Sequence, residues 1–147
     1  MKIRVNESPE IKEIEVVINC ETKSEHVNEI VQSLTYLNKL VTGKLDGRSY
    51  TLSPNKIYYF DSIDDKVFAY TKENMYEINL KLYQLEEIFM NTPLTRINKN
   101  TILNLKKIKT FVSSLNGRME AVLLNGEKMV ISRKYVSAIR QLLGGAQ

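Results

Sequence analysis

After Gly43 the chain consists of short apolar runs separated by turn residues, and this spacing limits it to folds rich in antiparallel strands. Two Asn-Gly pairs, at residues 116–117 and 125–126, separate three of these runs. The three runs span residues 108–112, 118–124 and 128–131. Because Asn-Gly favours the positive φ angles of a type I′ turn, each pair predicts a tight hairpin. Two successive hairpins predict a three-stranded antiparallel meander.

The same spacing of apolar runs and turn residues predicts further strands and two short helices. The additional strands are expected at residues 48–52, 57–60, 67–71 and 75–80. Apolar side chains at residues 82, 85, 88 and 89 predict a short helix that stops before Pro93. Ser132 is expected to cap a final helix with an apolar side at residues 136, 139 and 143, closed by Gly144-Gly145.

The first 45 residues have a different pattern. Residues 13–20 alternate between apolar and other side chains, which predicts a half-buried strand. Residues 22–25 resemble a capping box, and an amphipathic helix is expected to follow until Gly43. We therefore predict an α+β, mainly β protein in two parts. Residues 1–45 form a strand-helix extension for dimerisation or partner contact, and residues 46–147 form the main domain.

Composition excludes several classes of protein. Among 147 residues Cys20 is the only cysteine and His26 the only histidine, so an intramolecular disulfide and a Cys/His zinc site are excluded. The N-terminus lacks the apolar run of a signal peptide, and no uncharged stretch approaches the roughly 20 residues of a membrane helix. A cytoplasmic protein is expected.

Groups that could support catalysis are isolated from one another. His26 falls near the polar side of the predicted helix, where an exposed structural role is expected, and Cys20 is expected to be buried and inert. Asp61, Asp64 and Asp65 are better explained as a polar turn than as a metal site. We expect no enzyme, no metal, no cofactor and no small-molecule substrate.

The charge of the chain is concentrated towards its C-terminus. Residues 88–147 contain ten Lys or Arg against two Glu, a local net charge of +8 within a total of +4. Such asymmetry indicates a polyanionic partner.

Three basic segments could contact nucleic acid, and each has a plainer explanation that stays open here. Lys106, Lys107 and Lys109 could contact phosphate or simply be solvated. Residues 98–100, Asn-Lys-Asn, could pair with bases or form a turn. Residues 132–134, Ser-Arg-Lys, begin the predicted final helix, where free N–H groups favour phosphate and an arginine can bind guanine, or they are a capping serine followed by two solvated basic residues.

At these segments the sequence resembles the LytTR family of bacterial DNA-binding domains. Its motifs correspond to residues 55–61, 82–87, 94–97, 102–104, 125–127 and 131–135, covering the chain from about Gly43 to Leu143. The chain is similar overall to the short stand-alone LytTR regulators of Firmicutes. Its first 45 residues are too few for the receiver domain that other members carry.

The resemblance implies a β-rich fold whose loops enter successive major grooves of double-stranded DNA. It implies base contacts by Lys66, Lys99 and Arg133. It implies supporting phosphate contacts by Arg96, Asn98, Asn100, Arg118, Ser132 and Lys134. Where this chain has Asn98, family members often have His or Ser, so a different base preference is expected. The resemblance further implies paired direct repeats, a homodimer at least on DNA and, for some members, a small membrane-protein inhibitor.

Two alternatives to a DNA-binding regulator stay open. An RNA-binding module would use the same basic surface but would stack bases on exposed aromatic side chains, and residues 88–147 contain only three aromatic residues of any kind. A protein-interaction or anti-regulator role would place the function in the N-terminal helix.

Overall fold

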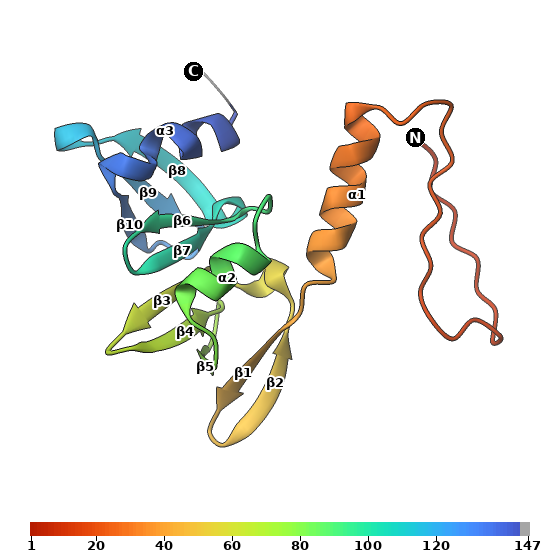
Figure 1. The fold of residues 1–147 in the computed structure, drawn as a ribbon, viewed down its shortest axis with the longest axis horizontal. Coiled ribbons are helices and arrows are strands. Elements are labelled where there is room, and N and C mark those ends of the chain that lie inside the picture. Colours follow the sequence, from red (N-terminus) through yellow and green to blue (C-terminus); the bar gives the residue numbers. More distant parts are fainter. Residues whose placement is uncertain (145–147) are drawn as a thin grey trace.

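The computed structural model describes residues 1–144 (Figure 1). Within that range the chain forms three α-helices and ten strands, joined in part by short 3-10 turns. The helices are α1 (Glu25–Leu37), α2 (Leu82–Ile88) and α3 (Arg133–Leu142). The strands are β1 (Val41–Leu45), β2 (Arg48–Leu52), β3 (Tyr59–Ile63), β4 (Lys66–Tyr70), β5 (Met75–Ile78), β6 (Leu94–Asn98), β7 (Thr101–Asn104), β8 (Ile108–Ser113), β9 (Met119–Leu123) and β10 (Lys128–Ile131).

The strands form two antiparallel sheets. The large sheet has the order β2-β1-β5-β4-β3-β7-β6, and the small sheet has the order β10-β9-β8. Each strand pair is antiparallel, and the small sheet is the meander expected around the two Asn-Gly pairs. The predicted α+β, mainly β class is therefore confirmed.

Two hydrophobic cores stabilise these layers. The first lies between the large sheet and α2, where the rings of Phe60 and Phe89 are 5.9 Å apart and Leu85 is fully buried. The second lies between the β3-β7-β6 side of the large sheet, the small sheet and α3. Ile139 of α3 is fully buried there, as the predicted apolar side of the final helix required.

The hairpin turns follow local chemistry with one exception. Asn116 and Gly117 both have positive φ, of 61° and 74°, as a type I′ turn needs. The type I′ prediction for residues 125–126 is wrong. Gly126 has φ +90°, but Asn125 is not among the residues with positive φ. The Asn125 side chain accepts a hydrogen bond from the Glu127 N–H at 3.0 Å, and Gly126 N–H donates to Leu123 O at 2.9 Å. Because the amide side chain stabilises its own turn, the connection takes a three-residue form with glycine at the positive φ.

The structure corrects the predictions for residues 13–20. These residues form no strand, because no other strand of residues 1–144 pairs with them. Ile14, Val16 and Val17 lie open to solvent, and Cys20 is exposed rather than buried. His26 is exposed, as expected.

The helix predicted to continue until Gly43 is shorter in the structure. Helix α1 begins after Ser24, whose Oγ accepts a hydrogen bond from Val27 N–H at 3.3 Å, and it ends at Leu37. Residues 41–45 are instead β1, an inner strand of the large sheet. A Cβ on Gly43 would lie 2.7 Å from Tyr76 Cβ, so this glycine permits close contact between β1 and β5 rather than ending a helix. The division of the chain at residue 45 stays a prediction.

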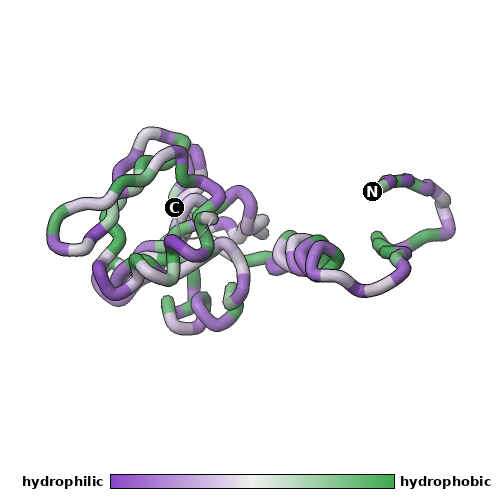
Figure 2. Tube along the Cα trace, turned by 90° about the horizontal axis from the view of Figure 1, so that it is seen from above, coloured by the Kyte–Doolittle hydropathy of each residue, from purple (hydrophilic) through white to green (hydrophobic). Residues whose placement is uncertain are grey.

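Helix α1 is joined to the sheets through a few side chains. Tyr36 is its only buried residue, and the buried Asn104 donates to the Tyr36 hydroxyl at 3.4 Å and to Ile57 O at 2.8 Å. Lys39 Nζ donates to Ile88 O at 2.6 Å. Residues 1–24 extend beyond α1, away from both sheets (Figure 2). No helix within residues 1–144 is both long enough and apolar enough to cross a membrane.

Candidate nucleic-acid interface

Two hairpin ends lie side by side at one end of the large sheet. Strand β3 pairs with both β4 and β7, so the β3–β4 turn and the β6–β7 turn point the same way (Figure 1). Ser62 N–H donates to Asn100 O at 2.9 Å and joins the two ends. Lys66 follows the first turn, and Lys99 and Asn100 form the second. These predicted contact residues are therefore brought together.

Two aspartates form the β3–β4 turn. Asp64 and Asp65 have φ angles of 51° and 64°, the pattern of a type I′ turn between the paired residues Ile63 and Lys66. Lys66 Nζ lies 3.7 Å from Glu77 Oε1, and both side chains are largely exposed, so the lysine remains free to exchange this contact for a phosphate or a base.

The β6–β7 turn is stabilised by Arg96. Its Nε donates to Asn98 O at 2.9 Å and its Nη2 donates to Lys99 O at 2.5 Å. Its Nη1 donates to Glu86 of α2 at 2.9 Å. Asn98 Oδ1 accepts from Asn100 N–H at 2.8 Å. The Arg96 side chain is only 19% exposed, so it shapes the turn, whereas Lys99 and Asn100 are exposed at its end.

The start of α3 lies beside β6. Ser132 N–H donates to Ile97 O at 2.9 Å, which places residues 132–134 next to Asn98. Ser132 occupies the N-cap position, but its side chain makes no capping hydrogen bond. Arg133 and Lys134 are exposed in the first turn of α3. Helix N-terminal N–H groups favour anions, and these two side chains add positive charge. Of the expected helix end, Gly144 has φ +118°, and Gly145 lies outside the described residues.

The Asn116-Gly117 turn supports Arg133. A Cβ built on Gly117 would lie 2.8 Å from Arg133 Cδ and 2.9 Å from Arg133 Cγ, so the arginine side chain crosses the turn where a larger residue would collide with it. Arg118 lies in the same shallow depression as Asn116, Ser132, Arg133 and Lys134.

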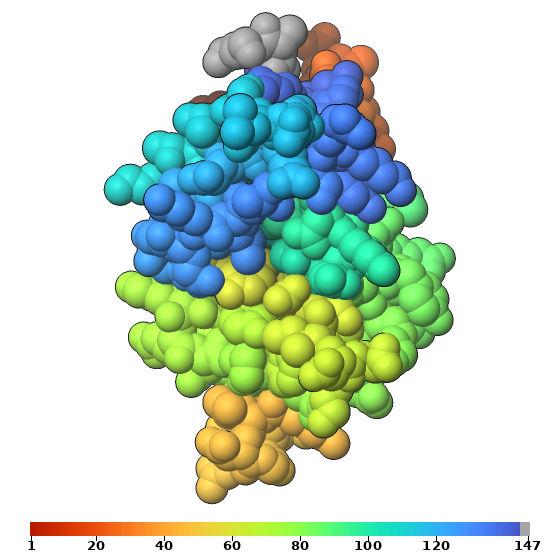
Figure 3. Space-filling view, turned by 90° about the vertical axis from the view of Figure 1, so that its left-hand side faces the viewer, coloured from red at the N-terminus to blue at the C-terminus, as the bar shows by residue number. Residues whose placement is uncertain are grey.

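Together these segments occupy one side of the molecule. Figure 3 shows the teal β6–β7 region between the blue C-terminal region and the yellow to yellow-green β3–β4 region. We call this surface the loop face, defined by the nine residues predicted to contact DNA. These are Lys66, Arg96, Asn98, Lys99, Asn100, Arg118, Ser132, Arg133 and Lys134.

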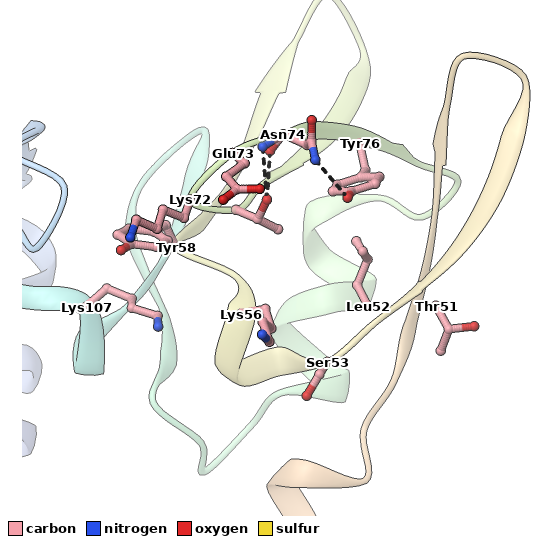
Figure 4. A pocket seen from close by; sticks show the side chains of 11 residues that line it. Thr51, Leu52, Ser53, Lys56, Tyr58, Lys72, Glu73, Asn74, Tyr76 and Lys107 are labelled. Carbon is pink, nitrogen blue, oxygen red and sulfur yellow. Dashed lines mark hydrogen bonds between the residues drawn. The ribbon is translucent and has the colours of Figure 1, made fainter.

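The run at residues 106–109 does not join the loop face. Lys106 and Lys107 form a turn at the far end of β7 from Lys99. Lys106 Nζ lies 5.9 Å from the Tyr36 ring centroid and Lys107 Nζ lies 5.0 Å from that of Tyr58. Figure 4 shows Lys107 near a second depression, which Lys56 and Lys72 also line.

A tyrosine at the start of β3 connects the two sheets. The Tyr59 hydroxyl donates to Glu127 Oε2 at 2.8 Å, and its ring stacks on Tyr70 at 4.4 Å. Burial, followed by the hydrogen bond and charge of Glu127, raises the pKa of Tyr59 above its usual range. Neutral Tyr59 therefore holds the β9–β10 turn against β3. Within residues 1–144, no three His, Cys, Asp or Glu side chains are grouped so that they could hold a metal ion.

Two residues that position the predicted contacts, Glu86 and Gly117, and one that joins the two sheets, Tyr59, could not be identified from the sequence. The Asn-Gly pair did signal a turn at residue 117, but its contact with Arg133 depends on packing between distant segments. Glu86 and Tyr59 had no such local signal, because their partners are 10 and 68 residues away in the chain.

Comparison with known proteins identifies the family of the chain. Residues 47–144 match the family described as the LytTr DNA-binding domain. The chain belongs to this family. LytTr domains are DNA-binding domains and not an enzyme class, so double-stranded DNA is the partner to consider first.

Individual LytTr relatives extend the comparison. The chain is 25% identical over 145 residues to an uncharacterised HTH-type transcriptional regulator of Staphylococcus aureus, covering 97% of this chain and 98% of the relative. It is 25% identical over 99 residues to the sensory transduction protein LytT of Enterococcus faecalis, covering 67% of this chain and 41% of that protein.

A solved LytTr domain has the same fold. This is the LytTr DNA-binding domain of a putative methyl-accepting/DNA response regulator from Bacillus cereus, with a TM-score of 0.67 and 24% identity. The match covers 71% of this chain and 96% of that structure. Although the Staphylococcus relative is named an HTH-type protein, α2 and α3 of this chain are separated by five strands within the described residues and form no helix-turn-helix.

Proposed function

We propose that this protein is a transcription regulator that binds specific double-stranded DNA through the loop face. The observation that carries the proposal is the pair of backbone hydrogen bonds from Ser62 to Asn100 and from Ser132 to Ile97. They align three segments from distant parts of the sequence along one surface. Their exposed side chains include Lys66, Lys99 and Arg133, of the types that bind phosphates and guanine edges.

Within this proposal the role of each residue follows from its exposure and from the contacts it already makes within the protein. Lys66, Lys99 and Arg133 are exposed at the three ends and would contact bases in the major groove. Asn98, Asn100, Arg118, Ser132 and Lys134 would support phosphate contacts. Arg96 is engaged by Glu86 and the backbone, so it would act chiefly by holding Lys99 in place.

We further propose that two protomers bind paired direct repeats. One loop face supplies only a few base contacts, and two linked faces multiply the specificity available to one. RNA is a weaker candidate because Tyr135, the aromatic residue next to Lys134, is partly buried in the second core instead of offering a free face for stacking.

The test is selection from a pool of random duplexes, with sequencing of the bound fraction at two salt concentrations. An enriched pair of spaced direct repeats is expected. Salt-sensitive binding without an enriched motif would contradict sequence-specific recognition. Competition with unlabelled single-stranded and double-stranded RNA should leave the selected complex intact.

A matched pair of triple variants tests the surface itself. Lys66→Ala/Lys99→Ala/Arg133→Ala removes three charges from the loop face, and Lys56→Ala/Lys72→Ala/Lys107→Ala removes three from the depression in Figure 4. Only the first should abolish binding to the selected duplex. Equal losses would mean that general charge, rather than the loop face, binds DNA.

A further inference from the structure

Residues 1–24 present apolar side chains that nothing in residues 1–144 covers. Ile3, Val5 and Ile14 are 80%, 81% and 92% exposed. The hydrogen bonds of these residues stay within the segment or reach only the first turn of α1. Exposed apolar stretches of this kind indicate a surface that is buried in an assembly.

Two parts of this segment have complementary patterns. In residues 2–6, Lys2 and Arg4 alternate with Ile3 and Val5. In residues 13–17, glutamates at 13 and 15 alternate with apolar residues at 14 and 16. Paired as β-strands, the two parts would place basic side chains opposite acidic ones on one face and collect the apolar side chains on the other.

Helix α1 supplies a second apolar surface next to this segment. Val31 and Leu37 are 40% and 44% exposed, and Tyr36 is the one residue of α1 that the sheets bury. In Figure 1, α1 and the preceding chain stand apart from the sheets, so this side of the helix is accessible. A paired apolar strand layer would fit against it as sheets pack on helices elsewhere.

We propose that residues 2–20 and α1 form the interface with a second copy of this chain. Residues 2–6 of each protomer pair with residues 13–17 of the other, and the shared apolar face packs on the two α1 helices. Within one chain no backbone hydrogen bond joins residues 2–6 to residues 13–17, so their complementary charges are left available to the same two parts of a second copy. The two-fold exchange uses both pairs at once and closes the assembly as a dimer.

This interface would hold two loop faces together, as paired DNA repeats require. The interface is separate from the proposed DNA binding and is tested without DNA. Failure of the interface proposal therefore does not contradict DNA binding, and failure of DNA binding does not contradict the interface. A preformed dimer would raise the effective concentration of the second loop face at its repeat.

Charge reversal tests the proposal on the full chain by sedimentation equilibrium. Lys2→Glu/Arg4→Glu and Glu13→Lys/Glu15→Lys should each weaken dimerisation by about tenfold or more, because like charges then face each other across the strand pair. Mixing the two variants should restore dimers. Both segments are acidic in the first variant and both are basic in the second, so opposite charges face each other when one chain of each kind associates.

The quadruple variant and a remote control complete the design. Lys2→Glu/Arg4→Glu/Glu13→Lys/Glu15→Lys should dimerise like the natural chain, and Lys56→Glu/Lys72→Glu, which reverses two charges of the Figure 4 depression, should have no effect. A monomeric natural chain, or normal dimerisation of either double charge-reversal variant by itself, would overturn the proposal. Recovery in the quadruple variant without recovery in the mixture would show pairing within one chain and would also overturn it.

An apolar test is independent of charge. Ile14→Asp should abolish dimers, whereas Leu115→Asp, at a residue that is 82% exposed in the turn before β9, should not. Circular dichroism of both variants checks that the sheets remain folded. Dimers that survive Ile14→Asp would contradict burial of residue 14 between two copies.

Discussion

The guanidinium of Arg96 donates a hydrogen bond to the carboxylate of Glu86 across 2.9 Å, and this contact connects helix α2 to the loop face. The same side chain binds the carbonyl oxygens of Asn98 and Lys99. Helix α2 is itself held by the buried Leu85 and Phe89. The position of an exposed lysine is therefore determined by a hydrophobic core through one arginine.

We expect Arg96→Lys to lower affinity for the selected duplex by about tenfold, because lysine cannot bridge two carbonyls and a carboxylate, and a lost charged hydrogen bond costs about 1.5 kcal/mol or more. Fluorescence anisotropy across a salt series distinguishes positioning from phosphate contact. Lysine keeps the positive charge, so a phosphate contact at this position would survive and affinity would change little, whereas a positioning role predicts lower affinity with an unchanged slope of log K against log salt.

Glu86→Gln should have a smaller effect in the same direction as Arg96→Lys. Glu87→Gln is the matched control, since Glu87 is an exposed neighbour on α2. Equal effects of the two glutamine variants would argue against transmission from α2 through Arg96.

Gly117→Ala should reduce both stability and DNA affinity. Alanine at φ +74° costs about 1 kcal/mol or more, and its Cβ would also collide with Arg133. Gly47→Ala carries the same backbone cost at φ +76° but meets no atom within 4 Å. Urea unfolding should give similar losses of stability for both. Anisotropy should show weaker DNA binding only for Gly117→Ala, and unchanged binding in that variant would remove Arg133 from the interface.

Arg133→Ala should lower affinity for the cognate duplex by about 1–3 kcal/mol, with a smaller loss on random duplex, because a bidentate contact to guanine discriminates between bases. Competition anisotropy with cognate and random duplexes measures the ratio. If both affinities fell equally, Arg133 would be a phosphate anchor and not a base contact.

Stability should fall at alkaline pH partly through Tyr36. Burial raises the pKa of this hydroxyl from its usual value near 10 to about 12, against a smaller opposing effect of the Asn104 hydrogen bond. The folded state therefore favours the neutral phenol, and its contribution is complete below pH 10 and is lost as the pH rises towards 12.

Urea unfolding at pH 9 and pH 11 checks this prediction. The free energy of unfolding should lose about 1 kcal/mol more in the natural chain than in Tyr36→Phe over this range. Tyr83→Phe, which alters an exposed tyrosine, is the control and should follow the natural chain.

Much of the fold was predictable because its signals are local. Asn116-Gly117 determines its own turn, Pro93 limits α2, and the apolar spacing of residues 136, 139 and 143 selects the buried side of α3. Local rules also explain the errors. Residues 13–20 have a strand pattern, but a strand needs a partner. Gly43 was predicted to end a helix because the sequence does not show that it lies in β1 against Tyr76 of β5.

The sequence by itself determined the antiparallel class, the meander, the basic C-terminal half and the types of side chain available to bind DNA, because turn chemistry, periodicity and charge are carried by neighbouring residues. Only the tertiary structure decided which of those side chains lie together. The Ser62–Asn100 and Ser132–Ile97 hydrogen bonds align three distant segments, Lys106 falls at the opposite end of β7, and Arg96 is engaged within the protein. Such placements depend on strand register and core packing, which arise from contacts between residues far apart in the chain.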